Sequence, residues 1–449
     1  MAFEIRLDSL ELENFHKFEH YTIGFDEHMT VLVGNNGSGK SSILDAACVA
    51  LGTFLVGVSS ASQRRITSSD ARIGLFDMGD FVDRQGQYPV TISACGRAGE
   101  GARAGEVKWS RSLNSAKGKA TIKDAMGLLD LSRECFERLK EGDADLVLPV
   151  ISYYGTGRLW AQGKGHGDRR PAPLSRQDGY KGALDASVSF DQVLDWFYRM
   201  TVEDLQREQG IKPMGRSPLF AAVRGAVERC FQALTGSKRV NVTYSLSSND
   251  LVVEYLDAAG EVHRMPLGLL SDGYRTTLSM IADIAYRMAL LNPALGEKVL
   301  DETPGVVLID EVDLHLHPLW QARILRDLRE IFPKVQFIVT THAPVVISSV
   351  SARHIRLLGD GAEARMPDGE IYGSDVGRVL ISVMGAPERP VEVQGRFDEF
   401  YRVLDERDFP QARAILDELE ALIGDEDTDL VGARIALSLE EADARYAAD

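Results

Sequence analysis

The sequence predicts an α/β protein in which a mainly parallel core sheet carries a glycine-rich loop and an acidic α-helical tail follows. The apolar run Met29–Val33 has the pattern of a buried strand, and a glycine-rich loop and a helical pattern come directly after it. Two further apolar runs, Val306–Asp310 and Val335–Thr340, flank a helical pattern at Leu319–Ile331. Strands that alternate with helices along a chain are typical of a parallel sheet covered by helices.

The segments around this core differ from it in pattern. Phe3–Leu7 alternates apolar and polar residues, as a half-buried strand does. Residues 59–119 are rich in Gly, Arg and Ser with short strand-like pieces, and we expect a β-arm with loops there. Helical patterns at Phe190–Glu208 and Ser217–Leu234 predict a helical insertion over residues 185–236.

The tail, residues 359–449, is predicted to be helical and acidic, with amphipathic patterns at Arg396–Leu404 and Gln411–Ile423. Residues 391–449 hold 17 acidic and six basic side chains, a net charge of −11, whereas the whole chain carries −17. An acidic field of this kind does not favour nucleic acid, but it belongs mostly to one segment. The negative charge is therefore a property of the tail more than of the rest of the chain.

Composition excludes several classes of protein. No run of 18 apolar residues is present, which argues against a membrane-spanning helix, and the N-terminal residues have no apolar signal core. The four cysteines stand singly rather than in CxxC pairs, which argues against a zinc ribbon or a disulfide framework. We therefore expect a cytoplasmic protein.

The first chemical motif is Gly34–Ser41, which satisfies the pattern GxxxxGK[ST] between a strand and a helix. Glycines allow backbone N–H groups to approach a phosphate closely, and the N-terminal end of the following helix favours an anion. Lys40 would contact the β- and γ-phosphates and Ser41 would hold Mg²⁺. The motif predicts an ATP and Mg²⁺ site.

The second motif is the carboxylate pair Asp310-Glu311 at the end of an apolar strand. Two adjacent carboxylates at a buried strand end are costly without a cation. Asp310 would orient Mg²⁺, and Glu311 would act as the general base that polarises the attacking water.

Three short motifs then add a resemblance. Leu270–Arg275 resembles the signature motif of ABC-type ATPases, and Gly273 lies 37 residues before Asp310. His342 lies 32 residues after Asp310 and resembles the switch histidine, while Asp313 stands where the family has its D-loop. The resemblance implies a P-loop ABC-ATPase head and a head-to-tail homodimer, or a higher even oligomer. In such a dimer Ser271 and Gly273 would act in trans on ATP held by the other copy.

Three further segments indicate which branch of the ABC-type ATPases the chain resembles. Leu12–Phe18, Ser41–Ala46 and Leu314–Pro318 are similar to segments of the SMC, RecF and OLD ATPases. Only 107 residues follow His342, without the strand pattern of a Toprim nuclease or a long coiled coil. The chain therefore resembles the compact PtuA ATPases of Septu and retron-associated Septu anti-phage systems. That resemblance implies a separate HNH nuclease partner, PtuB, and makes the acidic tail a candidate docking region for it. The alternative is a tail that packs on its own ATPase core with its charges solvated. The alternatives are a RecF-like repair clamp that binds DNA directly and, with less support, a transporter ATPase.

The ATPase head is assigned to residues 1–358. The candidate catalytic residues are Glu311 and His342, and the candidate metal ligands are Ser41 and Asp310. The candidate nucleotide-binding residues are Asn35, Asn36, Gly37, Ser38, Gly39, Lys40, Ser41, Ser42, Ser271, Asp272, Gly273 and Asp313.

Weaker patterns leave alternatives open. His315 and His317 form an HxH pair, but no further ligand cluster lies nearby in the sequence, and a strand-to-helix joint explains the pattern better. The polar loop with Lys164, Arg169 and Arg170 is a possible contact for nucleic acid. For the family's Q-loop glutamine, Gln63 and Gln87 are candidates by position alone.

Overall fold

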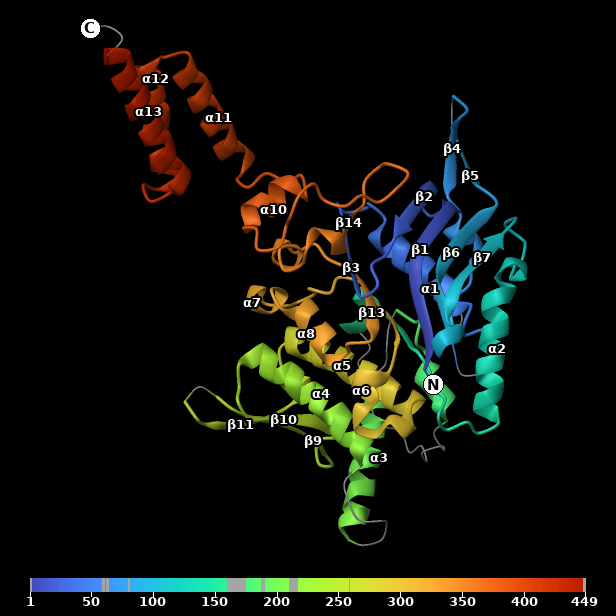
Figure 1. Cartoon of the computed structure of the whole chain (residues 1–449). Helices are drawn as coiled ribbons and strands as arrows, with labels where there is room; N and C mark the ends of the chain where they lie inside the picture. Colours follow the sequence, from blue (N-terminus) through green and yellow to red (C-terminus); the bar gives the residue numbers. More distant parts are fainter. Residues whose placement is uncertain are drawn as a thin grey trace. The chain divides into compact units, whose positions relative to one another are not determined.

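The structure, a computed structural model, describes residues 2–58, 61, 64–79, 81–159, 175–186, 190–209, 217–257 and 259–446. It divides into two compact units, Met1–Ser374 and Asp375–Asp449 (Figure 1). The sequence placed this boundary at 358/359. The difference arises because residues after 358 return to the first unit, where Arg365 pairs with Leu357 and Glu363 with Thr22.

The first unit is built on a five-stranded parallel sheet, as predicted, with the strand order β14-β3-β13-β12-β8. Every residue of the four longer strands is buried, which is typical of a parallel sheet covered on both faces. The carboxyl ends of β3, β12 and β13 therefore lie side by side at one edge. The strands are β3 (Met29–Val33), β8 (Val150–Tyr154), β12 (Gly305–Ile309), β13 (Val335–Thr340) and β14 (Ile355–Leu357).

Helix α1 (Lys40–Gly52) packs between this sheet and a second, antiparallel sheet. Ten of its 13 residues are buried, because the two sheets enclose the helix on opposite sides. The antiparallel sheet has the order β2-β1-β6-β7, and Trp109 donates from its indole nitrogen to the Ala50 carbonyl oxygen at 3.0 Å. Its strands are β1 (Phe3–Phe15), β2 (Phe18–Gly24), β6 (Val90–Glu100) and β7 (Gly105–Leu113).

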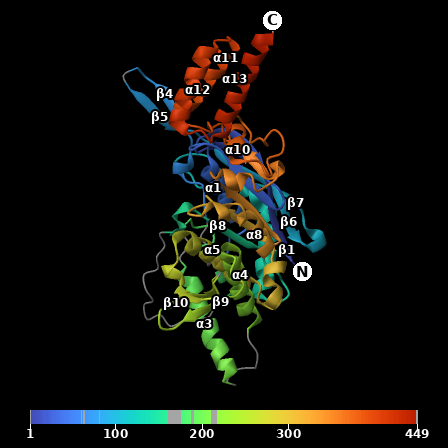
Figure 2. The same ribbon diagram turned by 90° about the vertical axis from the view of Figure 1, so that its left-hand side faces the viewer.

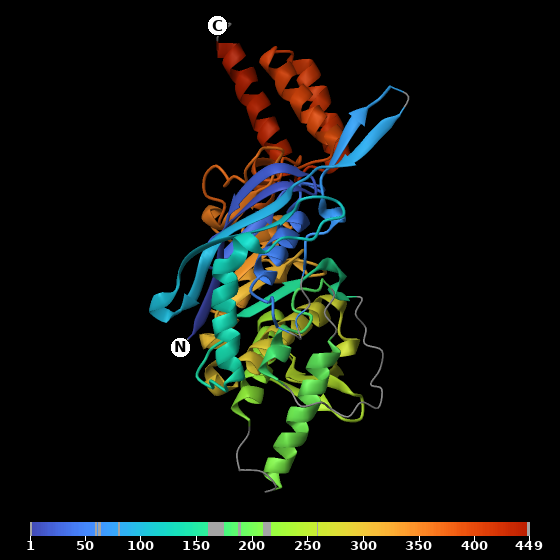
Figure 3. The same ribbon diagram turned by 90° about the vertical axis from the view of Figure 1, so that its right-hand side faces the viewer.

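The expected β-arm over residues 59–119 is only partly separate. Strands β4 (Ile73–Asp77) and β5 (Val82–Gly86) form a hairpin that stands out from the unit (Figure 3). Strands β6 and β7 instead belong to the antiparallel sheet, because the alternate residues of β6, from Val90 onward, are buried against α1.

Two helices occupy the predicted insertion, α3 (Asp191–Glu208) and α4 (Pro218–Thr235). Ser217 caps α4 and Gly236, with φ +72°, ends it. The expected single helix over Leu319–Ile331 is wrong, since the backbone leaves helical geometry at Arg323, with φ −129°. The remaining elements of this unit are α2 (Met126–Lys140), β9 (Val240–Ser245), β10 (Asp250–Leu256), β11 (Val262–Pro266), α5 (Asp272–Leu291), α6 (Val299–Glu302), α7 (Pro318–Gln321), α8 (Ile324–Ile331) and α9 (Pro344–Ile347).

The second unit is helical, with a short helix followed by a three-helix bundle (Figure 2). Twelve buried apolar residues form its core. Arg389 lies over the Phe397 ring and is ion-paired with Asp427 and Asp429, and Asp427 also accepts hydrogen bonds from the first turn of the last helix. These contacts give Asp427 a structural role. The helices are α10 (Val376–Ser382), α11 (Val391–Asp405), α12 (Phe409–Ile423) and α13 (Thr428–Tyr446).

Candidate nucleotide-binding site

The loop between β3 and α1 has a backbone that requires glycine. Gly37 and Gly39 have φ of +78° and +99°, in the left-handed region that side chains disfavour. A Cβ on Gly39 would lie 2.3 Å from the Phe18 ring, and one on Gly34 would lie 2.7 Å from the Leu358 carbonyl oxygen. Phe18 and the Leu358 backbone therefore pack closely against this loop and leave no room for a side chain at Gly39 or Gly34.

Lys40 is almost fully buried, and its ammonium group donates to the carbonyl oxygens of Gly34 at 2.7 Å and Asn35 at 3.1 Å. Burial lowers the pKa of Lys40, and the charges of Asp310 and Glu311 only partly offset this. The buried hydroxyl of Ser38 has no hydrogen-bond partner in the described part of the chain. A buried cation and an unsatisfied hydroxyl in one loop fit a phosphate group.

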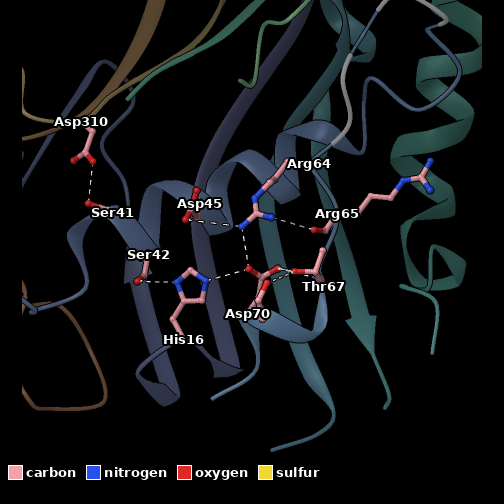
Figure 4. Close-up of polar contacts among 10 residues, drawn as sticks. His16, Ser41, Ser42, Asp45, Arg64, Arg65, Thr67, Asp70 and Asp310 are labelled. Atoms are coloured by element: carbon pink, nitrogen blue, oxygen red, sulfur yellow. Dashed lines mark hydrogen bonds and ion pairs between the residues drawn. The ribbon is translucent and has the colours of Figure 1, made fainter. Parts of the chain in front are cut away.

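Asp310 follows β12, and both of its carboxylate oxygens are held. The Ser41 hydroxyl donates to one at 2.9 Å (Figure 4). The Thr340 hydroxyl donates to the other at 2.6 Å. No three His, Cys, Asp or Glu side chains gather as a metal cage within the described ranges. Mg²⁺ commonly binds through one carboxylate, a hydroxyl, phosphate oxygens and water, so Ser41 and Asp310 suit this ion.

Glu311 adopts a left-handed backbone with φ +49°, and its amide donates to the Thr340 hydroxyl at 2.7 Å. A non-glycine residue in this region is strained, and such strain often occurs at functional sites. Thr340 thus holds both members of the carboxylate pair, because its hydroxyl donates to the Asp310 side chain and accepts from the Glu311 backbone amide. Thr340 precedes His342 in the sequence by two residues, but the sequence indicated no role for it.

His342 follows β13 and lies within electrostatic range of the same groups. Burial lowers its pKa, and so does the charge of Lys40, against the opposing effects of Glu311, Asp313 and Asp310. The Thr341 hydroxyl donates to Asp313 at 2.5 Å, which ties the segment after β12 to the segment after β13. The structure therefore brings together the candidate residues from three separate regions of the sequence.

The signature segment begins α5 and lies against another segment of the same chain. A Cβ on Gly273 would be 2.4 Å from the His315 carbonyl oxygen, and Tyr274 packs on Trp320 with ring centroids 4.2 Å apart. Ser271 is exposed at the N-cap of α5, and its side chain makes no capping hydrogen bond. The first turn of this helix therefore keeps N–H groups available for an anion.

A polar cluster beside the P-loop helix is the main feature that the sequence did not reveal (Figure 4). His16, with φ +51° between β1 and β2, lies 2.9 Å from the Ser42 hydroxyl through Nδ1 and 3.2 Å from Asp70 through Nε2. Arg64 and the Thr67 amide also contact the buried Asp70 carboxylate, at 3.0 and 2.7 Å. Burial alone would raise the pKa of Asp70, but its contacts with His16, Thr67 and Arg64 hold it well below its usual range.

We predict that His16→Ala lowers the free energy of unfolding, because it removes the hydrogen bonds from His16 to Ser42 on helix α1 and to the buried Asp70 carboxylate. Loss of a hydrogen bond to a buried charge costs about 1.5–3 kcal/mol of unfolding free energy. Because folding lowers its pKa, the stability contributed by the Asp70 carboxylate is complete above about pH 4 and is lost only as the pH falls through the lowered pKa. Denaturant unfolding at pH 7, where this carboxylate is ionised, should therefore show the loss of unfolding free energy in full. His20→Ala, at an exposed neighbouring position of β2, is the control, and equal losses for both variants would contradict the prediction.

The weaker sequence patterns have separate outcomes. His317 accepts a hydrogen bond from the Leu319 amide at the start of α7, which is a structural use of the HxH pair. Gln87 donates to the Gln85 carbonyl oxygen at the base of the β4–β5 hairpin. Gln63 and the basic loop with Lys164, Arg169 and Arg170 lie outside the described residues. Within the described ranges, none of the helices combines the length and the apolar character that a membrane span requires.

Comparison with protein families gives two matches. Residues 9–212 match a family described as an AAA domain. Residues 181–348 match one described as "AAA domain, putative AbiEii toxin, Type IV TA system". Together these matches include the P-loop, the signature segment, the carboxylate pair and His342.

Several known proteins are similar to this chain. The Retron Ec83 probable ATPase of Escherichia coli is 27% identical over 90% of this chain and 79% of its own length. The Retron Vc95 probable ATPase of Vibrio cholerae is 25% identical over 80% of this chain and 74% of its own length. The Septu protein PtuA of Bacillus thuringiensis is 32% identical over 39% of this chain and 45% of its own length.

Among solved structures, an SMC head bound to the C-terminal winged-helix domain of ScpA is 18% identical, with a TM-score of 0.47, and covers 81% of this chain and 98% of that one. The SMC head domain from Thermotoga maritima is 17% identical, with a TM-score of 0.40, and covers 82% of this chain and 100% of that one.

Proposed function

We propose that this chain, which is an ATP-hydrolysing protein of the SMC and RecF type similar to the retron and Septu ATPases, is the ATP-binding subunit of a bacterial anti-phage defence complex. The observation that carries the proposal is the convergence of Lys40 and Ser41, which follow β3, with Asp310 and Glu311, which follow β12 on the other side of β13. Bound ATP and Mg²⁺ supply the phosphoanhydride and the charge that neutralises it.

The roles of the side chains follow from their environments. Lys40, which donates to the carbonyl oxygens of Gly34 and Asn35, would hold phosphate oxygens when ATP is bound, and the Ser41 hydroxyl, which donates to Asp310, would hold Mg²⁺. Thr340 keeps Asp310 oriented and holds the backbone of Glu311, whose carboxylate accepts a proton from the attacking water. Burial and the charge of Lys40 lower the pKa of His342, which favours the neutral imidazole, and we propose that this side chain hydrogen-bonds the γ-phosphate.

We propose further that two copies close head-to-tail around two nucleotides. Ser271 is exposed and uncapped at the start of α5, so that its hydroxyl and the first N–H groups form a second anion site. Gly273 packs on the His315 carbonyl, which ties this site to the chain that follows Glu311. Such a contact would couple the signature of one copy to hydrolysis at that copy's own P-loop.

Intermolecular complementation tests this arrangement. Lys40→Ala removes the P-loop cation, and Gly273→Ala places a methyl group against backbone and disrupts the signature, so each variant alone should lose ATPase activity. An equal mixture should regain about a quarter of wild-type activity, because half of the dimers are mixed and each mixed dimer has one intact site. Phosphate release from the single variants and from the mixture measures this.

The matched control is Gly225→Ala in α4, where an added Cβ meets nothing within 4 Å. This variant should dimerise and hydrolyse ATP like the wild-type chain. A mixture of Lys40→Ala and Gly273→Ala that stays inactive while the control is active would contradict the shared site.

The nuclease function is assigned to a partner. The relatives named retron ATPase and PtuA suggest a defence system, and we propose that the ATP state of this chain gates a separate HNH-type nuclease. Purification of the complex from its native operon with ATP, followed by mass spectrometry and DNA-cleavage assays, tests this. A dimer that retains DNA without any nuclease would favour a RecF-like clamp instead.

A further inference from the structure

Helix α13 is apolar on two opposite faces, which the bundle alone does not require. Leu430, Ala433 and Leu437 lie on one face and belong to the core of the second unit. Val431, Ile435 and Leu439 lie on the other, with exposed fractions of 41%, 56% and 63%. These three, the α13 stripe, follow at four-residue spacing and span about 12 Å of one helix face.

The surroundings of the stripe leave room for another backbone. Gly432 and Ser438 lie beside it and are both exposed, and a Cβ added to Gly432 would meet nothing within 4 Å. Small residues flanking larger apolar ones allow a second helix to pack closely. The stripe therefore has the form of one half of a helix–helix contact.

The charge of the unit indicates which helix would fit. Residues 375–449 contain no lysine, and eight arginines stand against 19 acidic side chains, a net charge of −11. Asp443 continues the four-residue spacing of the stripe and is exposed. Five of the arginines are already ion-paired with carboxylates of the unit, namely Arg389, Arg396, Arg402, Arg413 and Arg434.

The negative charge of the second unit excludes three other occupants of the α13 stripe, namely nucleic acid, an anionic lipid surface and a second copy of the chain. Nucleic acid and anionic lipid surfaces would be repelled, and two such units would bring 22 negative charges together. We propose that the α13 stripe docks an amphipathic helix of a partner protein, with aliphatic anchors at i, i+4 and i+7 flanked by Lys and Arg. The inference rests on the proposed function, in which a separate nuclease subunit carries that helix.

A synthetic 20-residue helix with leucines at that spacing and flanking lysines serves as the probe, and a version with glutamates in place of the lysines is its counterpart. Fluorescence anisotropy with the full-length chain should show binding of the lysine peptide only. Ile435→Ser and Leu439→Ser should each weaken it at least tenfold, and Leu246→Ser, at an exposed site in the first unit, should not. Asp443→Lys should weaken the lysine peptide and strengthen the glutamate peptide.

Equal binding of both peptides, no binding of either, or no effect of the stripe variants would overturn the docking site. So would a fall in self-association of the Ile435→Ser chain in sedimentation, since the stripe would then bind a second copy. The proposed function is tested separately by nuclease recovery with the wild-type chain. If Ile435→Ser still recovers the nuclease, the docking site is wrong while the gating proposal stands.

Discussion

Glu311→Gln should reduce ATP hydrolysis by about 10²- to 10⁴-fold while ATP remains bound, because the substitution removes the general base and keeps the side-chain shape. Glu311 also contributes a negative charge near Lys40, and its loss should favour the ATP anion. We therefore expect an ATP-bound dimer to accumulate. Single-turnover phosphate release and light scattering with ATP measure the two effects.

The control is Glu330→Gln on α8, an exposed glutamate paired with Arg326 at 3.6 Å. It should hydrolyse ATP at the wild-type rate and form no trapped dimer. If Glu311→Gln turned over at the wild-type rate, the base would have to be another group. A variant that binds ATP but stays monomeric would remove the support for head-to-tail closure.

Lys40→Ala should weaken ATP binding by about 10²- to 10⁴-fold. A charge-assisted hydrogen bond contributes about 1.5–3 kcal/mol, and two such bonds to phosphate oxygens are lost together. Without nucleotide the variant should be at least as stable as the wild-type chain, because burial of the cation is itself unfavourable. Thermal unfolding with and without ATP should thus show an unchanged baseline and the loss of the ATP-induced rise in Tm.

Lys334→Ala provides the comparison, since Lys334 is an exposed lysine ion-paired with Glu302. Its ATP-induced rise in Tm should equal that of the wild-type chain. A Lys40→Ala protein that unfolds at a much lower temperature without ATP would show that Lys40 acts chiefly through its contacts with the loop carbonyls.

The sequence alone determined the parallel sheet and the position of the phosphate site. Apolar runs such as Met29–Val33 identify strands buried on both faces, and the GxxxxGK[ST] pattern needs glycine where the backbone takes positive φ. The pair Asp310-Glu311 stood out because adjacent carboxylates at a buried strand end need a cation. All of these signals are local in the chain.

Only the tertiary structure decided which distant residues support the site. His16 contacts both Ser42 and Asp70, although 54 residues separate it from Asp70, and Thr340 reaches Asp310 from the neighbouring strand. No local pattern marks a histidine or a threonine for such a contact, because the contact depends on strand order and on where each strand ends. The same reason explains the assignment of β6 and β7 to the antiparallel sheet, since pairing with β1 connects segments about 90 residues apart.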